Sequence, residues 1–140
     1  MTYDQYIDEQ IRESKTGNVY ADTILSSCGN DEHCTVESLQ KLSHTEKQEI
    51  ILITVDNLLD AFQKSELICH QHAHHMGEFL LGYFNANLTK ALSLASGKCG
   101  GAMYHGIVEN YFLAGVFSGS LKLENLDISK SCDILNNNPQ

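Results

Sequence analysis

Four histidines and a cysteine lie within seven residues of the stretch CHQHAHHMGEF, which runs from Cys69 to Phe79. Imidazole nitrogens and thiolates are the usual protein ligands of zinc and of several other transition metals. Two of these histidines, His70 and His74, are four residues apart, and on a helix two imidazoles at this spacing can converge on one ion. They do not complete a site, because structural zinc takes four protein ligands and catalytic zinc takes three.

A second pair at the same spacing follows in YHGIVENYF, where His105 is four residues before Glu109. Antiparallel packing of this helix against the first would bring HxxxH to face HxxxE, and Gly77 and Gly106 would allow the two helices to approach closely. Three imidazoles and a carboxylate suit one transition-metal ion, zinc or copper, with iron as a further choice. The predicted metal ligands are His70, His74, His105 and Glu109.

Two carboxylates are candidates for catalysis. If one coordination position stays open, a bound ion can activate water, and Glu109 or Glu78 can move the proton. The chain has no HExxH protease motif, because Gln71 follows His70. These residue types therefore fit a metalloenzyme and a metal-binding protein without catalysis equally.

The other histidines point elsewhere. A helix advances about 100° per residue, so His72 and His75 fall about 200° and 140° from His70, away from the apolar face that contains Cys69 and Met76. We therefore expect His72 and His75 to be solvated. We expect His33 and His44 at the surface, in loops or at a helix start.

Two further interpretations of the histidines stay open. In one, the histidines only make hydrogen bonds in the core, as His105 could with Glu109, and the protein is a disulfide-stabilised interaction module without a metal. In the other, haem is held between the two helices by histidines, although the chain has no CxxCH attachment motif.

The elements that must position these residues are helices. Ser43 and Glu46 have the spacing of a capping box and predict the start of a helix whose apolar positions recur every 3.6 residues through Phe62. Asn87 predicts the cap of a shorter helix, and GKCGG predicts a break before the last one. The other predicted helices cover residues 3–14, 19–27, 35–42, 66–84 and 102–114.

Strand patterns are sparse, so we predict an all-α fold, a compact single-domain helical bundle stabilised by disulfides. The domain covers residues 1–140, with a motif-bearing core at about 43–115 and a polar tail at about 133–140. Eighteen acidic and nine basic residues give a formal charge of −9. This charge excludes nucleic acid and anionic membrane surfaces as partners and favours a cationic ligand.

Five cysteines are many for a chain of 140 residues, and none forms a CxxC pair. Cys28 and Cys34 bracket the polar turn CGNDEHC and predict a short disulfide loop. The other pairings stay open, and the odd count leaves a thiol for a metal or for a protein partner or second copy. Disulfides predict an extracytoplasmic protein, secreted or membrane-anchored. The acidic N-terminus does not resemble a signal peptide, and no apolar run reaches the roughly 18–20 residues of a membrane span.

The paired motifs of residues 66–112 resemble a group of uncharacterised archaeal and bacterial extracytoplasmic helical proteins. Those proteins carry CHxxxHxxGE followed by CxxGxYHGxxE, and here Ala102 stands at the usual glycine. The group brings no known reaction with it. The resemblance implies that His70, His74, His105 and Glu109 are the marked positions. It also implies that Cys69 and Cys99 belong with them, as a disulfide that joins the two site helices.

Overall fold

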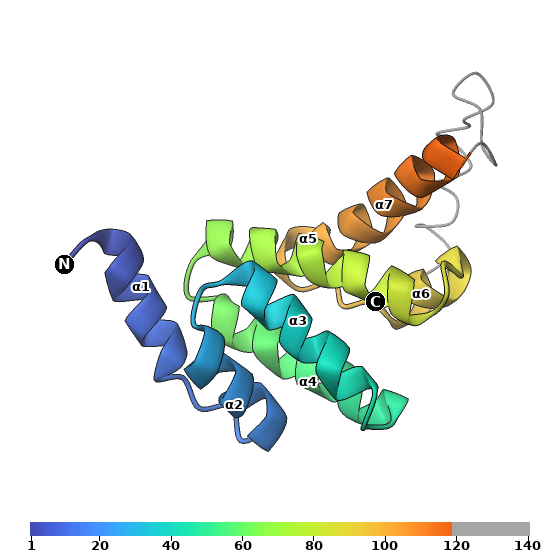
Figure 1. Ribbon diagram of the computed structural model, residues 1–140. Coiled ribbons are helices and arrows are strands. Elements are labelled where there is room, and N and C mark those ends of the chain that lie inside the picture. The colour runs from blue at the N-terminus through green and yellow to red at the C-terminus, as the bar shows by residue number, and fades with distance from the viewer. Residues whose placement is uncertain (119–140) are drawn as a thin grey trace.

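The computed structural model describes residues 1–118 of the chain, and these residues form seven α-helices and one 3₁₀ turn (Figure 1). No strand occurs within them, so the predicted all-α fold is confirmed. The predicted polar tail lies outside the described residues. The elements are α1 (Tyr3–Arg12), α2 (Val19–Cys28), α3 (Glu32–Ser43), α4 (Gln48–Phe62), α5 (Glu66–Tyr83), α6 (Leu88–Leu94), η1 (Cys99–Gly101) and α7 (Ala102–Ser118).

Polar side chains begin most of these helices by accepting a hydrogen bond from the first turn, as N-caps do. The predicted cap of α6 is confirmed, because Asn87 accepts a hydrogen bond from the backbone N–H of Lys90 at 3.0 Å. Helices α1, α2, α3 and α5 have such caps at Thr2, Asn18, Asp31 and Ser65.

The capping box predicted at Ser43 and Glu46 is wrong. Ser43 is the last residue of α3, and its hydroxyl donates to the backbone oxygen of Gln40. The carboxylate of Glu46 instead accepts a hydrogen bond of 2.6 Å from the hydroxyl of Tyr20. Helix α4 begins after Lys47 without a side-chain cap, so packing of its apolar face must hold its start.

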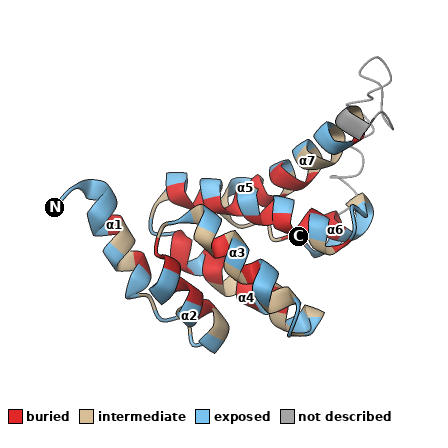
Figure 2. Cartoon of the chain, in the orientation of Figure 1, coloured by how far each residue is buried: buried red, intermediate tan, exposed pale blue. Residues whose placement is uncertain are grey.

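Helix α5 lies at the centre of the fold, between α7 on one side and α3 and α4 on the other (Figure 1). One hydrophobic cluster contains residues from all seven helices, and buried positions follow α5 on more than one side (Figure 2). The largest side chains with almost no exposure are Ile11, Leu25, Leu39, Ile51, Leu58, Leu59, Phe62, Met76, Leu80, Leu92, Met103 and Ile107.

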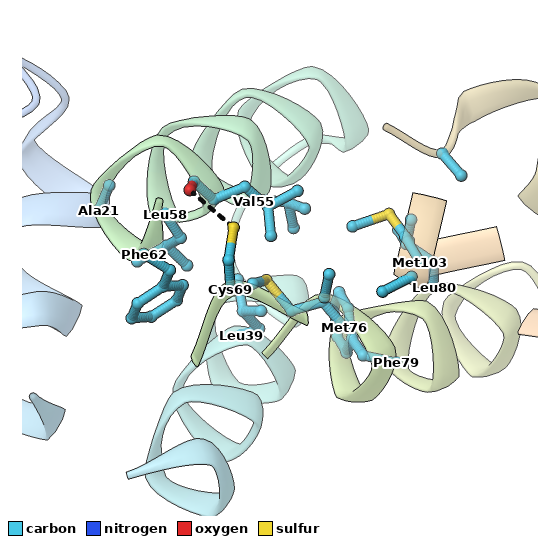
Figure 3. Close-up of a cluster of buried hydrophobic side chains, with 14 of the residues drawn as sticks. Ala21, Leu39, Val55, Leu58, Phe62, Cys69, Met76, Phe79, Leu80 and Met103 are labelled. Carbon is cyan, nitrogen blue, oxygen red and sulfur yellow. Dashed lines mark hydrogen bonds between the residues drawn. The ribbon is translucent and has the colours of Figure 1, made fainter. Parts of the chain in front are cut away.

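Two disulfides connect these helices. The predicted Cys28–Cys34 bridge closes the turn between α2 and α3, and Cys69–Cys99 joins α5 to η1, as the sequence resemblance implied. Figure 3 shows Cys69 among the core side chains, with its sulfur 3.8 Å from the backbone oxygen of Leu59. The fifth cysteine, Cys132, lies outside the described residues. Among the seven helices of residues 1–118, none is long and apolar enough to cross a membrane.

Candidate functional site

Two glycines bring α5 and α7 into backbone contact. A Cβ atom at Gly77 would lie 2.3 Å from the backbone oxygen of Met103, and a Cβ atom at Gly106 would lie 2.1 Å from the backbone oxygen of His74. Both distances are far below a van der Waals contact, so no larger residue fits at either position without moving a helix. The predicted close approach of the two helices is confirmed, and it brings the side chains beside the crossing opposite one another.

The antiparallel packing predicted for these helices is wrong. Both run in the same general direction in Figure 1, and the Cys69–Cys99 disulfide joins the N-terminal part of α5 to the turn just before α7. Helix α6 and the segment after it carry the chain back to the start of α5. Lys98 holds that segment on α4, because its ammonium pairs with Asp56 at 2.9 Å and with Asp60 at 2.8 Å.

This direction decides which predicted ligands face each other. Nε2 of His74 lies 2.9 Å from Oε2 of Glu109, and the rings of His70 and His105 stand edge to face with centroids 6.4 Å apart. We call the edge of the α5–α7 crossing formed by His70, His74, His105 and Glu109 the seam. The structure therefore brings the four predicted ligands to the helix crossing as two facing pairs, four residues apart on each helix.

The seam is open to solvent. His70, His105 and Glu109 are exposed, and the side chain of His74 is 29% exposed. A hollow of 530 Å³ adjoins His70 and is lined by Glu66, Gln63, Gly100 and the Cys69–Cys99 disulfide. In the part of the chain that the structure describes, no three His, Cys, Asp or Glu side chains are placed so that they could hold a metal ion. The two pairs of the seam are therefore neighbours without forming a closed ligand group.

The prediction that His72 is solvated is wrong. Its side chain is buried, its ring stacks on Phe62 with centroids 3.7 Å apart, and its Nε2 is 3.0 Å from Oδ1 of Asn30. Burial lowers the pKa of His72 to about 4, against the opposing effect of the hydrogen bond to Asn30. His72 is therefore a neutral core residue at ordinary pH.

Asn30 also connects His72 to α1. Its backbone N–H donates to Oδ1 of Asp8 at 2.8 Å, and this hydrogen bond holds the pKa of Asp8 below its ordinary value. We call the group formed by Asp8, Asn30, Phe62 and His72 the Asn30 corner. The Cys28–Cys34 disulfide brackets Asn30 in the chain, so this corner and the seam each lie beside a disulfide.

A signal for the burial of His72 exists in the sequence. At about 100° per residue, Ile68 lies about 40° and Phe79 about 20° from His72 around the helix axis. Both are buried, so the buried face of α5 extends past Cys69 and Met76 to His72. The helical wheel counted only the stripe of Cys69 and Met76, and this is why it assigned His72 to solvent.

The remaining predicted residues are not members of the seam, although the ring of His75 stands edge to face with that of His74, with centroids 6.2 Å apart. His75 is exposed as predicted, and its Nε2 lies 3.0 Å from Oε2 of Glu32 on α3. His33 and His44 are exposed, as predicted, although His33 belongs to α3 and not to a loop. Glu78 is exposed and lines a groove to which none of the four predicted ligands contributes.

Comparison of the chain with known protein families, with curated proteins and with solved structures found no match.

Proposed function

We propose that this protein binds one transition-metal ion at the seam, through His70, His74 and His105, with Glu109 as the fourth ligand or as a base beside the ion. The observation that carries the proposal is the meeting of the two motifs in two pairs, His74 with Glu109 and His70 with His105. Three imidazoles and a carboxylate suit zinc first, then copper and iron.

One distance of the seam, that between His74 and Glu109, supports the fit, and the other two ligands must move to complete it. Two ligands of a tetrahedral zinc ion are roughly 3.3 Å apart, since each lies 2.0–2.2 Å from the metal. Nε2 of His74 and Oε2 of Glu109 are 2.9 Å apart. If these two atoms moved apart by a few tenths of an ångström, a metal ion could replace the proton that they share. The rings of His70 and His105 must turn toward this pair. Because both side chains are exposed, no core packing opposes their rotation.

A bound ion would supply a Lewis acid that makes water a better nucleophile. Glu109 lies where it could hold the proton of such a water, because its carboxylate already binds the imidazole of His74. For Glu78 the support is weaker, because this carboxylate lines the groove beside α3. Catalysis is therefore proposed through Glu109.

We also propose that the protein works outside the cytoplasm, secreted or anchored to a membrane. Two disulfides support this location, because such bridges persist in oxidising compartments and are rare in the cytosol. The paired motifs support a relationship with the archaeal and bacterial proteins that the sequence resembles.

Zinc titration by calorimetry tests the proposal, together with elemental analysis and an absorption spectrum of the purified protein. A Cys132→Ser background removes the one cysteine that neither disulfide uses. We expect one equivalent of metal and a loss of affinity of at least about tenfold in His70→Ala and in His105→Ala. His33→Ala is the control, because it removes an exposed imidazole from α3, which contributes no residue to the seam.

Two results would show the proposal to be wrong. One is purified protein with less than about a tenth of an equivalent of metal that also takes up none on titration. The other is a loss of zinc affinity in His33→Ala equal to that in His70→Ala, which would mean unspecific binding to surface histidines. An absorption spectrum with the Soret band of haem would support the haem interpretation instead.

A further inference from the structure

A groove of 1010 Å³ runs along α5 between α3 and α7, on a part of the surface that the seam does not use. Apolar side chains line much of it, among them Val36 of α3 and Phe79, Leu81 and Tyr83 of α5. Its volume is at the upper end of the range for sites of small ligands, and it is only partly enclosed.

The charged residues around this groove are all acidic or histidine. Glu32 and Glu37 line it from α3 and Glu78 from α5, together with His33, His44 and His75. No lysine or arginine from residues 1–118 lines the groove. The field is therefore negative above an apolar floor, within a chain whose formal charge is −9.

Part of the groove is empty because of a glycine. A Cβ atom added at Gly82 would meet no atom within 4 Å, although Gly82 lies within α5 and lines the groove. Glycine is a poor helix former, and the closely packed Gly77 and Gly106 have a packing reason that Gly82 does not have. A larger side chain at Gly82 would project into the groove.

We propose that this groove binds a basic amphipathic segment of a partner protein. The apolar floor takes the apolar face of that segment, and its lysines and arginines meet Glu32, Glu37 and Glu78 at the rim. A second copy of this chain is a poorer occupant, because two molecules of charge −9 repel one another. Anionic lipid and nucleic acid are repelled by the same charges.

Fluorescence anisotropy tests the proposal with a labelled synthetic helix of leucine and lysine, about 14 residues long or roughly four turns, whose leucines share one face. The control peptide has the same composition in an order that spreads the leucines around the helix. We expect the first peptide to bind at least about tenfold more tightly than the second, because both carry the same charge and only one has an apolar face.

Three protein variants locate the site. Gly82→Leu fills the groove without changing any charge, and we expect at least about a tenfold loss of affinity. The triple variant Glu32→Gln, Glu37→Gln, Glu78→Gln should lose a similar factor. Its matched control, Glu9→Gln, Glu13→Gln, Glu49→Gln, removes three exposed acids outside the groove and should stay within about threefold of the parent protein.

Circular dichroism must first show that Gly82→Leu is folded and unfolds cooperatively on heating. The proposal is overturned if this folded variant binds the peptide as tightly as the parent protein does. It is equally overturned if the two triple variants lose the same affinity, because attraction would then come from total charge. Equal binding of the two peptides would show that the apolar floor has no part in recognition.

Discussion

His70 and His72 are two residues apart on one helix, yet the imidazole in the seam is exposed and the imidazole in the Asn30 corner is buried. His70 is exposed at the crossing with α7, opposite the ring of His105. His72 is buried between Phe62 and Asn30, and its pKa is lowered to about 4. The same side chain is therefore available as a ligand in one region and is a neutral packing element in the other.

The cost of removing an imidazole from water explains why these two histidines of α5 behave differently. A buried imidazole gains hydrogen bonding and ring stacking but loses its exchange with solvent and ions. The exposed residues of the seam contribute little to folding, since the side chain of Glu109 is 57% exposed beside His74. The relative position of α5 and α7, which carry the seam, is fixed by the backbone contact at Gly77 and Gly106 and by the Cys69–Cys99 disulfide.

Removal of a disulfide is expected to have the largest effect on the free energy of unfolding, and the two regions differ in the length of the loop that their disulfide closes. Cys69→Ala with Cys99→Ala opens a loop with a sequence separation of 30, and Cys28→Ala with Cys34→Ala opens one of 6. From loop entropy, the first pair should lower the free energy of unfolding by about 3–4 kcal/mol and the second by about 2 kcal/mol. Urea unfolding measures both, and a larger loss from the shorter loop would contradict the account.

Within the Asn30 corner, acid should remove the contribution of His72 to stability before that of Asp8. The folded pKa of His72 is about 4 and the ordinary value is 6.5, so the unfolded chain takes up the proton first as the pH falls. The contribution of His72 is complete above pH 6.5 and is lost between pH 6.5 and 4, by about 3 kcal/mol. Asp8, whose folded pKa is below 3.8, loses its contribution only at lower pH.

The difference between wild type and His72→Gln isolates this effect, because glutamine can still donate to Asn30 but does not titrate. Unfolding by urea at a series of pH values should show a shallower loss between pH 6.5 and 4 for His72→Gln. His70→Gln is the control in the seam. Parallel curves for wild type and His72→Gln would show that His72 is not the buried titrating group.

A methyl group at the helix crossing should have the next largest effect. In Gly106→Ala the new Cβ would lie 2.1 Å from the backbone oxygen of His74, so α7 must move. We expect a loss of about 2–3 kcal/mol in the free energy of unfolding. Gly82→Ala is the control on α5, where a Cβ meets nothing within 4 Å. It should stabilise the protein by about 0.5–1 kcal/mol, and equal effects of the two substitutions in thermal unfolding would refute the close crossing.

The smallest effect on folding is expected at the carboxylate of the seam. Glu109→Gln removes the charge beside His74 from an exposed pair, so the free energy of unfolding should change by at most about 0.5 kcal/mol. Zinc affinity should nevertheless fall by about tenfold or more, whether Glu109 is a ligand or supports one. Urea unfolding and zinc calorimetry measure the two quantities, and a large loss of stability with unchanged affinity would reverse the assignment.

Local sequence patterns predicted most of the helices and the close approach of the two histidine-bearing ones, because caps, period and i, i+4 spacing act within a few residues. Asn87 caps α6 as predicted, and His74 does face a residue of the second motif. Longer-range packing decided the rest. Ser43 ends α3 because Glu46 pairs with Tyr20, a partner 26 residues away.

The pairing within the seam also depended on distant contacts. The direction of α7 follows from the return of the chain through α6 and from the anchoring of Lys98 on Asp56 and Asp60. No pattern near His105 carries that information. The burial of His72 likewise needs Asn30, which is 42 residues earlier in the chain.

The most direct test of metal binding at the seam is an NMR titration that follows the ring signals of all seven histidines while zinc is added. We predict that the signals of His70, His74 and His105 change together and reach their end point at one equivalent. The signals of His33, His44 and His72 should stay where they are. If the seam histidines do not respond, or if they respond only after the other exposed histidines, then the seam is not a metal site.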